Sequence, residues 1–106
     1  MKQISVIEAR VWLEGGRPPV TLLDVREDWE YKIAHLPGSI LISMGQISSR
    51  SGELPRDQAI IVMCHHGRRS ETVAIQLEQI GFNNIYNLNG GINAWSRQVD
   101  AAIPTY

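Results

Sequence analysis

Short apolar runs alternate along the chain with stretches in which apolar residues recur at helical spacing. The runs are typical of strands buried on both faces of a parallel sheet, and they cover residues 20–25, 39–42, 59–63 and 84–88. Helices are predicted at residues 6–14, as a short acidic turn at 27–31, from Arg69 to Gly81, and at 92–97. Strands that alternate with helices favour an α/β domain whose mostly parallel sheet is flanked by helices.

Capping and turn residues support these boundaries. Ser5 and Glu8 form a capping-box pattern at the start of the first predicted helix, and Gly15 closes it. The polar stretch 48–52 predicts a surface loop. We expect ligands at the carboxyl ends of the strands, as in other open parallel sheets.

Length and composition limit the classes of function. With 106 residues the chain is expected to form one domain over 1–106. A net charge of −1 argues for neither a nucleic-acid nor a membrane-surface partner. No segment has transmembrane length or the pattern of a secretory signal, and a single cysteine fits a reducing compartment. We therefore expect a cytoplasmic protein, with a monomer as the default state.

The single cysteine, Cys64, lies where a buried strand ends and a helix begins. Helix N-terminal N–H groups and nearby cations favour a thiolate over a thiol. Gly67 allows successive backbone N–H groups to turn inward and form an anion-binding nest. The alternative is a small buried hydrophobic cysteine, but two arginines and two histidines within five positions favour a reactive sulfur.

The charged neighbours of Cys64 favour an anionic ligand. Arg68 and Arg69 oppose the helix dipole at their position, and a bound anion would remove this conflict. Zinc is disfavoured, because the adjacent residues Cys64, His65 and His66 cannot easily occupy tetrahedral positions around one ion. His35 precedes a turn and is expected to bond to backbone there.

Three motifs in this order and spacing resemble those of the rhodanese family of single-domain sulfurtransferases. The first comprises Leu22-Leu23-Asp24-Val25-Arg26-Glu27, then Glu30-Tyr31 and His35-Leu36-Pro37-Gly38-Ser39. The second is Cys64-x-x-Gly67-x-Arg69-Ser70, and the third is Leu88-x-Gly90-Gly91-Ile92-x-Ala94-Trp95. Ala34 and Ser39 depart from the first motif, which often has glycine and alanine there.

The resemblance implies a three-layer α/β/α fold with a five-stranded, mostly parallel sheet. It also implies a sulfurtransferase in which Cys64 takes sulfane sulfur from a small anionic donor, thiosulfate or polysulfide, as a persulfide. The acceptor would be cyanide in an assay, and a thiol or a dithiol protein in the cell, in ping-pong order. No metal or organic cofactor would be needed.

The resemblance also assigns roles to residues around the sulfur. The substrate cradle would comprise His65, His66, Gly67, Arg68, Arg69 and Ser70. Asp24 and Arg26 would brace this loop, Trp95 would be a packing anchor, and Trp29 would lie near the mouth of the site. The interpretation requires Cys64 to be ionised and exposed to solvent at the floor of an amide-lined bowl.

Two other classes of function stay open at this point. A cysteine phosphatase or arsenate reductase is one, although phosphatases with rhodanese topology use Cys-x5-Arg and Arg69 is only the fifth residue after Cys64. The other is a binding module or persulfide carrier for a specific partner protein. The presence of both the cysteine and the full loop favours an enzyme over a module that only binds.

Overall fold

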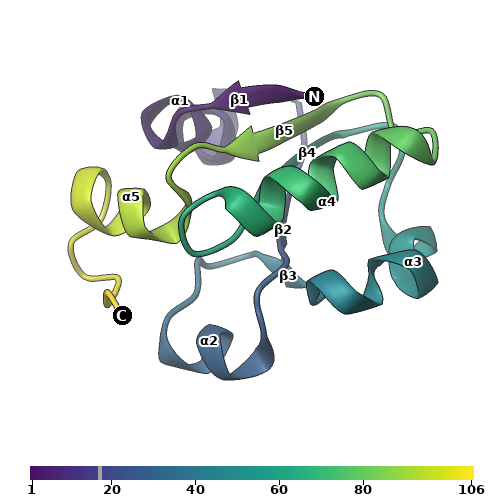
Figure 1. Ribbon diagram of the computed structural model, residues 1–106. Coiled ribbons are helices and arrows are strands. Elements are labelled where there is room, and N and C mark those ends of the chain that lie inside the picture. The colour runs from purple at the N-terminus through teal and green to yellow at the C-terminus, as the bar shows by residue number, and fades with distance from the viewer. Residues whose placement is uncertain (17) are drawn as a thin grey trace.

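Five parallel strands form the centre of the structure (Figure 1). The computed structural model describes residues 1–16 and 18–106. The strands pair in the order β1-β5-β4-β2-β3, and every pair is parallel. Their bounds are β1 Lys2–Ile4, β2 Val20–Asp24, β3 Ile40–Leu41, β4 Ala59–Met63 and β5 Ile85–Leu88. The predicted α/β fold with a five-stranded sheet is confirmed.

Helices cover both faces of this sheet. One face carries α1, Val6–Val11, which continues as a π-helical turn, Trp12–Gly16, and α5, Gly91–Gln98. The other carries α4, Arg68–Gln79, and α3, Ile47–Arg50, which lies between two 3₁₀ turns, Met44–Gln46 and Ser51–Glu53. The short helix α2, Asp28–Ile33, follows β2.

The side chains of β4 point alternately to the two faces of the sheet, and each set joins the hydrophobic core on its own face. Ile60 and Val62 pack with the apolar side of α4, whereas Ile61 and Met63 pack with α1 and α5. All four side chains are buried, which accounts for a continuous apolar run instead of an alternating one. Cys64, the next residue, belongs to the core on the α4 side.

One prediction from the pattern is wrong, and one strand was not predicted. The polar stretch 48–52 is helical, because α3 and the following 3₁₀ turn bury Ile47 and Leu54 at its two ends. The edge strand β1 was not predicted, since only one of its three residues, Ile4, is buried. No helix in residues 1–16 and 18–106 is long and apolar enough to cross a membrane.

Candidate active site

The loop after β4 is shaped by contacts between its backbone and α5. The amides of Ile92 and Asn93 donate to the carbonyl oxygens of Cys64 and His65 at 2.9 and 3.1 Å. A side chain at Gly91 would overlap these two carbonyls, so the third motif requires glycine at that position. Gly67 ends the loop with φ of 105°, a left-handed conformation, and α4 begins at the next residue.

Two donors approach the sulfur of Cys64. The Gly67 N–H lies 3.1 Å from Sγ, and the Ser70 hydroxyl oxygen lies 3.3 Å from it. One loop amide therefore points at the sulfur as the nest prediction requires. The wider cradle of amides stays a prediction.

The expected exposure of the sulfur is wrong. Cys64 is only 1% exposed, because its side chain continues the row of buried residues on the α4 side of β4. A cavity of about 190 Å³ nevertheless reaches it, lined by Cys64, His65, His66, Arg68 and Arg69. Cys64 therefore lines a cavity large enough for a small donor, although the residue is barely exposed to bulk water.

A chain of hydrogen bonds leads from the sulfur through the buried side chains of Ser70 and Asn87. Ser70 Oγ lies 2.5 Å from Asn87 Oδ1, and Asn87 Nδ2 donates to the carbonyl of Gly67 at 3.1 Å and to Gln3 Oε1 at 3.0 Å. Asn87, on β5, therefore joins the first turn of α4 to the cysteine loop. Its side chain fixes both the hydroxyl and the backbone that contact the sulfur.

Arg69 forms a two-pronged ion pair with Glu30 of α2. Its Nη1 and Nη2 lie 2.6 and 2.8 Å from the two carboxylate oxygens. The Glu30 side chain is only 4% exposed, against 36% for Arg69. The charge of Arg69 is therefore largely compensated within the protein, and its contact with substrate stays a prediction.

The surroundings of Glu30 strongly favour its charged form. The Arg69 guanidinium is the main cause, and with the Tyr106 hydroxyl and the Glu27 amide it lowers the pKa of Glu30 to about 2, against the opposing effect of burial. Glu30 also closes a capping box with Glu27 at the start of α2. The same carboxylate thus caps α2 and holds the start of α4.

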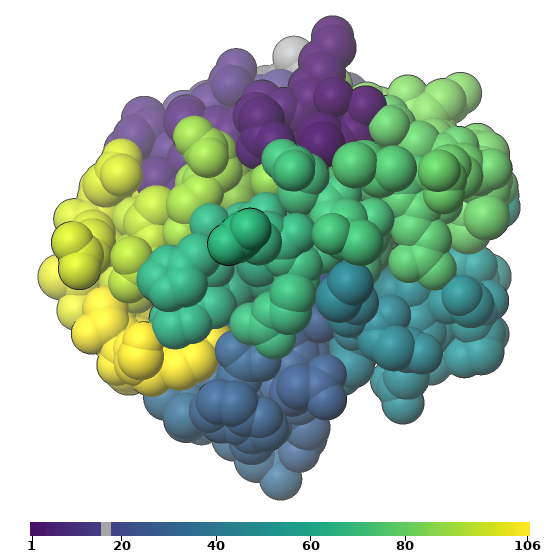
Figure 2. Space-filling model, in the orientation of Figure 1, coloured from purple at the N-terminus to yellow at the C-terminus, as the bar shows by residue number. Residues whose placement is uncertain are grey.

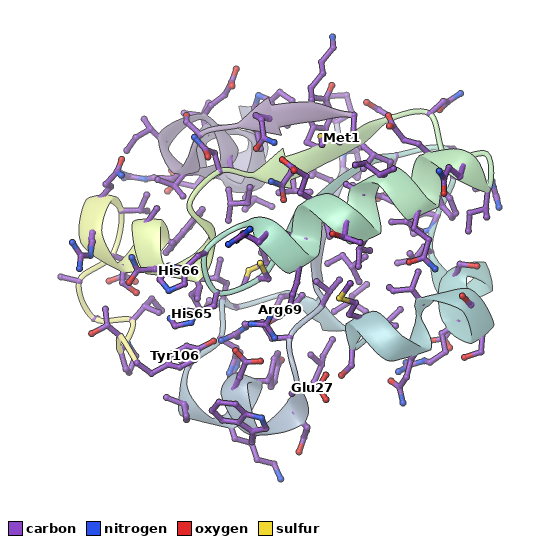
Figure 3. All side chains as sticks on the ribbon, in the orientation of Figure 1. Met1, Glu27, His65, His66, Arg69 and Tyr106 are labelled. Carbon is purple, nitrogen blue, oxygen red and sulfur yellow. The ribbon has the colours of Figure 1, made fainter. Side chains whose placement is uncertain are left out.

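Tyr106 inserts its side chain between two ion pairs. Its hydroxyl accepts from Arg26 Nη1 at 2.9 Å and donates to Glu30 Oε2 at 2.7 Å. Its ring stacks on His65 with centroids 3.9 Å apart and planes 6° apart. Figure 2 shows this last segment, in yellow, between the teal cysteine loop and the blue segment of α2, and Figure 3 shows Tyr106 beside His65.

Asp24 and Arg26 form a fully buried ion pair at the end of β2. Arg26 Nη2 lies 2.7 Å from Asp24 and equally close to the carbonyl of Ala34, while Nη1 reaches Tyr106. Their predicted bracing of the cysteine loop therefore has an indirect route, through Tyr106 and Glu30. Among the described residues, no buried side-chain nitrogen or oxygen lacks a hydrogen-bond partner.

In contrast to Arg69, the neighbouring Arg68 carries a charge that is not paired within the described residues. Arg68 is exposed, and its guanidinium forms no ion pair or hydrogen bond with the part of the chain that the structure describes. His66, also exposed, lies against His65 with ring centroids 3.9 Å apart. Burial, with a contribution from His66, lowers the pKa of His65. The free positive charge at the mouth thus belongs to Arg68.

The structure brings Cys64, His65, His66, Arg68 and Arg69 to one cavity, whereas Gly67 and Ser70 contact the sulfur without lining that cavity. It also adds three residues that sequence reasoning missed. These are Glu30, Asn87 and Tyr106. Glu30 lies in the predicted acidic turn and in the first motif, although no role at the site was assigned to it, and nothing local marks the other two. Trp29 is 61% exposed, and its ring centroid lies 6.3 Å from that of Tyr106, but it does not line the cavity, so its place near the mouth stays a prediction.

Comparison with known proteins assigns the family. Residues 6–98 match the family of the rhodanese-like domain. The chain belongs to this family of rhodanese-like sulfurtransferases. It is 30% identical to a rhodanese-like domain protein of Staphylococcus aureus, whose crystal structure it matches with a TM-score of 0.83 over 100% of this chain and 99% of that one.

Two relatives carry more specific names. Thiosulfate sulfurtransferase GlpE of Pseudoalteromonas translucida is 34% identical over 94 residues, 89% of this chain and 88% of that protein. YrkF of Bacillus subtilis, named as a sulfur carrier protein, is 37% identical over 81 residues. That match covers 76% of this rhodanese-like chain but only 44% of YrkF.

Proposed function

We propose that the protein transfers sulfane sulfur from a small anionic donor, thiosulfate or a polysulfide, to a thiophilic acceptor through a persulfide on Cys64. The observation that carries the proposal is the position of the sulfur. Cys64 Sγ faces the Gly67 N–H and the Ser70 hydroxyl, and Cys64 lines a small cavity together with the free cation of Arg68. Such a cavity suits a compact anion.

In the first half-reaction, the Cys64 thiolate attacks the outer sulfur of thiosulfate. A new S–S bond forms, the S–S bond of the donor breaks, and its electron pair leaves with sulfite. Arg68 attracts the dianion and stabilises charge on the departing sulfite, because its guanidinium has no partner among residues 1–16 and 18–106. Arg69, held by Glu30, fixes the shape of the loop.

In the second half-reaction, an acceptor attacks the outer sulfur of the persulfide. Cyanide becomes thiocyanate and a thiol becomes a persulfide, while the electrons of the broken S–S bond return to Cys64 as thiolate. The chain has one cysteine and cannot resolve its persulfide as an internal disulfide. The acceptor, a thiol, a dithiol protein or cyanide, is therefore external.

Replacement of the nucleophile tests the proposal. Cys64→Ser should abolish thiocyanate formation from thiosulfate and cyanide while the circular dichroism spectrum stays unchanged. Mass spectrometry of the wild type after thiosulfate treatment should show an adduct about 32 Da heavier, which cyanide removes. Turnover by the folded serine variant would rule out the proposed mechanism.

The similarity to YrkF favours a persulfide carrier as the second candidate. A carrier would load sulfur as an enzyme does, but would pass it slowly to small acceptors and rapidly to one protein. Multiple turnovers with cyanide identify an enzyme. Stoichiometric loading without turnover identifies a carrier.

A further inference from the structure

A buried hydroxyl beside Cys64 faces two acceptors but has one proton. Ser70 Oγ lies 2.5 Å from Asn87 Oδ1 and 3.3 Å from Cys64 Sγ. All three residues are buried, and among the described residues no other group donates to Asn87 Oδ1. Since a hydroxyl donates a single hydrogen bond, Ser70 satisfies Asn87 or the sulfur, but not both at once.

The orientation of the Asn87 amide follows from its other contacts. Its Nδ2 faces the Gly67 carbonyl and Gln3 Oε1, and a reversed amide would place oxygen against both of these oxygens. Gln3 is oriented in turn, because its amide nitrogen donates to the carboxylate of Glu71 at 2.8 Å. Asn87 therefore presents an oxygen to Ser70 and has no hydrogen to offer there.

This arrangement places the Ser70 proton on the Asn87 side while Cys64 is a thiol. Two oxygens 2.5 Å apart without a hydrogen between them would repel, whereas the thiol can donate its own proton to Ser70 Oγ. Once the thiol is deprotonated, the hydroxyl reaches the sulfur only by leaving Asn87. The two groups then compete for one donor.

We propose that Asn87 is a positioning residue that limits the thiolate content of Cys64 by holding the Ser70 hydroxyl proton. The inference deepens the proposed function and rests on it, because it takes Cys64 as the reacting sulfur. The other charged or titratable groups around the sulfur are His65, His66, Arg68 and the Glu30-paired Arg69. They are retained in every variant below, so differences among the variants report on the hydroxyl.

The test is the pH titration of thiolate absorbance in the Asn87→Leu variant. Leucine has a similar size but accepts no hydrogen bond, so Ser70 becomes free to donate to the sulfur. The titration curve should move to lower pH. At a pH well below the midpoint, the thiolate fraction should be roughly fivefold higher than in the wild type. Asn87→Ala, which removes the same acceptor with less bulk, should give the same direction if the leucine variant does not fold.

A double-mutant cycle separates this role from a merely structural one. In the Ser70→Ala background there is no hydroxyl to redirect, so Asn87→Leu should leave the titration curve in place. An equal shift with and without Ser70, or no shift in a folded single variant, would overturn the proposal. The readout needs no sulfur donor, so either result is independent of whether the protein turns over thiosulfate.

Discussion

Arg68 and Arg69 are neighbours in sequence, yet they lie in opposite electrostatic surroundings. Arg69 is bound to a buried carboxylate on α2, and the pair continues through Tyr106 to Arg26 and Asp24. Arg68 points into solvent beside the cavity with no partner among residues 1–16 and 18–106. One arginine therefore builds the site, and the other is available to a ligand.

The largest difference should appear in stability. Arg69→Ala leaves Glu30 charged, buried and without its main partner, and should lower the free energy of unfolding by roughly 3 to 4 kcal/mol. Arg68→Ala is the matched control and should change it by less than about 0.5 kcal/mol. Urea denaturation of both variants measures the contrast. Equal losses would show that the two arginines are equivalent.

The second-largest effect should come from low pH, which weakens the ion pair between Glu30 and Arg69. The pKa of Glu30 is lowered to about 2 in the folded protein from its usual 4.5, so its stabilising effect is full above about pH 5 and is lost as the pH falls towards 2. We expect a loss on the order of 2 to 3 kcal/mol over that range. Urea midpoints measured against pH should fall less steeply in Glu30→Gln than in the wild type.

Donor binding should show the reverse ranking of the two arginines. Arg68→Ala should raise the KM for thiosulfate roughly tenfold with cyanide as acceptor, because about 1.4 kcal/mol of charge-assisted binding is lost. Arg68→Lys should restore part of it, since the charge remains. Arg69→Lys, measured at a temperature where it is fully folded, should leave the KM nearly unchanged. A larger effect at Arg69 would assign recognition of the donor to that residue.

The smallest effect concerns the hydroxyl of Tyr106. Tyr106→Phe keeps the ring on His65 but removes the bonds to Arg26 and Glu30, and should cost about 1 kcal/mol. The pKa of His65, followed by NMR, should stay low in this variant. In Tyr106→Ala it should rise towards 6.5, because burial is the main cause of its lowering. An unchanged pKa of His65 in Tyr106→Ala would show that the tyrosine ring is not what buries the histidine.

Most of the fold could be predicted from local pattern, whereas the electrostatics of the site could not. The run at 59–63 coincides with β4, and the helix predicted from Arg69 to Gly81 lies within two residues of α4 at each end. Such runs carry their own signal, because burial on both faces demands apolar residues throughout. β1 carries none, with one buried residue out of three.

The missed contacts join residues that are far apart in sequence. Glu30 and Arg69 are separated by 39 positions, and Glu30 and Tyr106 by 76. Without a fold, no spacing rule relates them, so both arginines had the same expected role. The burial of Cys64 follows from the register of β4, in which every second residue faces α4.

The pairing of the first strand with the last has a consequence for synthesis on the ribosome. Within the described chain, β1 pairs with β5 alone. The carbonyl groups of Cys64 and His65 also have no partner until the amides at the start of α5 are in place. An emerging polypeptide cannot close this sheet until β5 has left the exit tunnel. We therefore expect the sheet to assemble in one late, cooperative step. Until then the Cys64 thiol would be exposed to solvent.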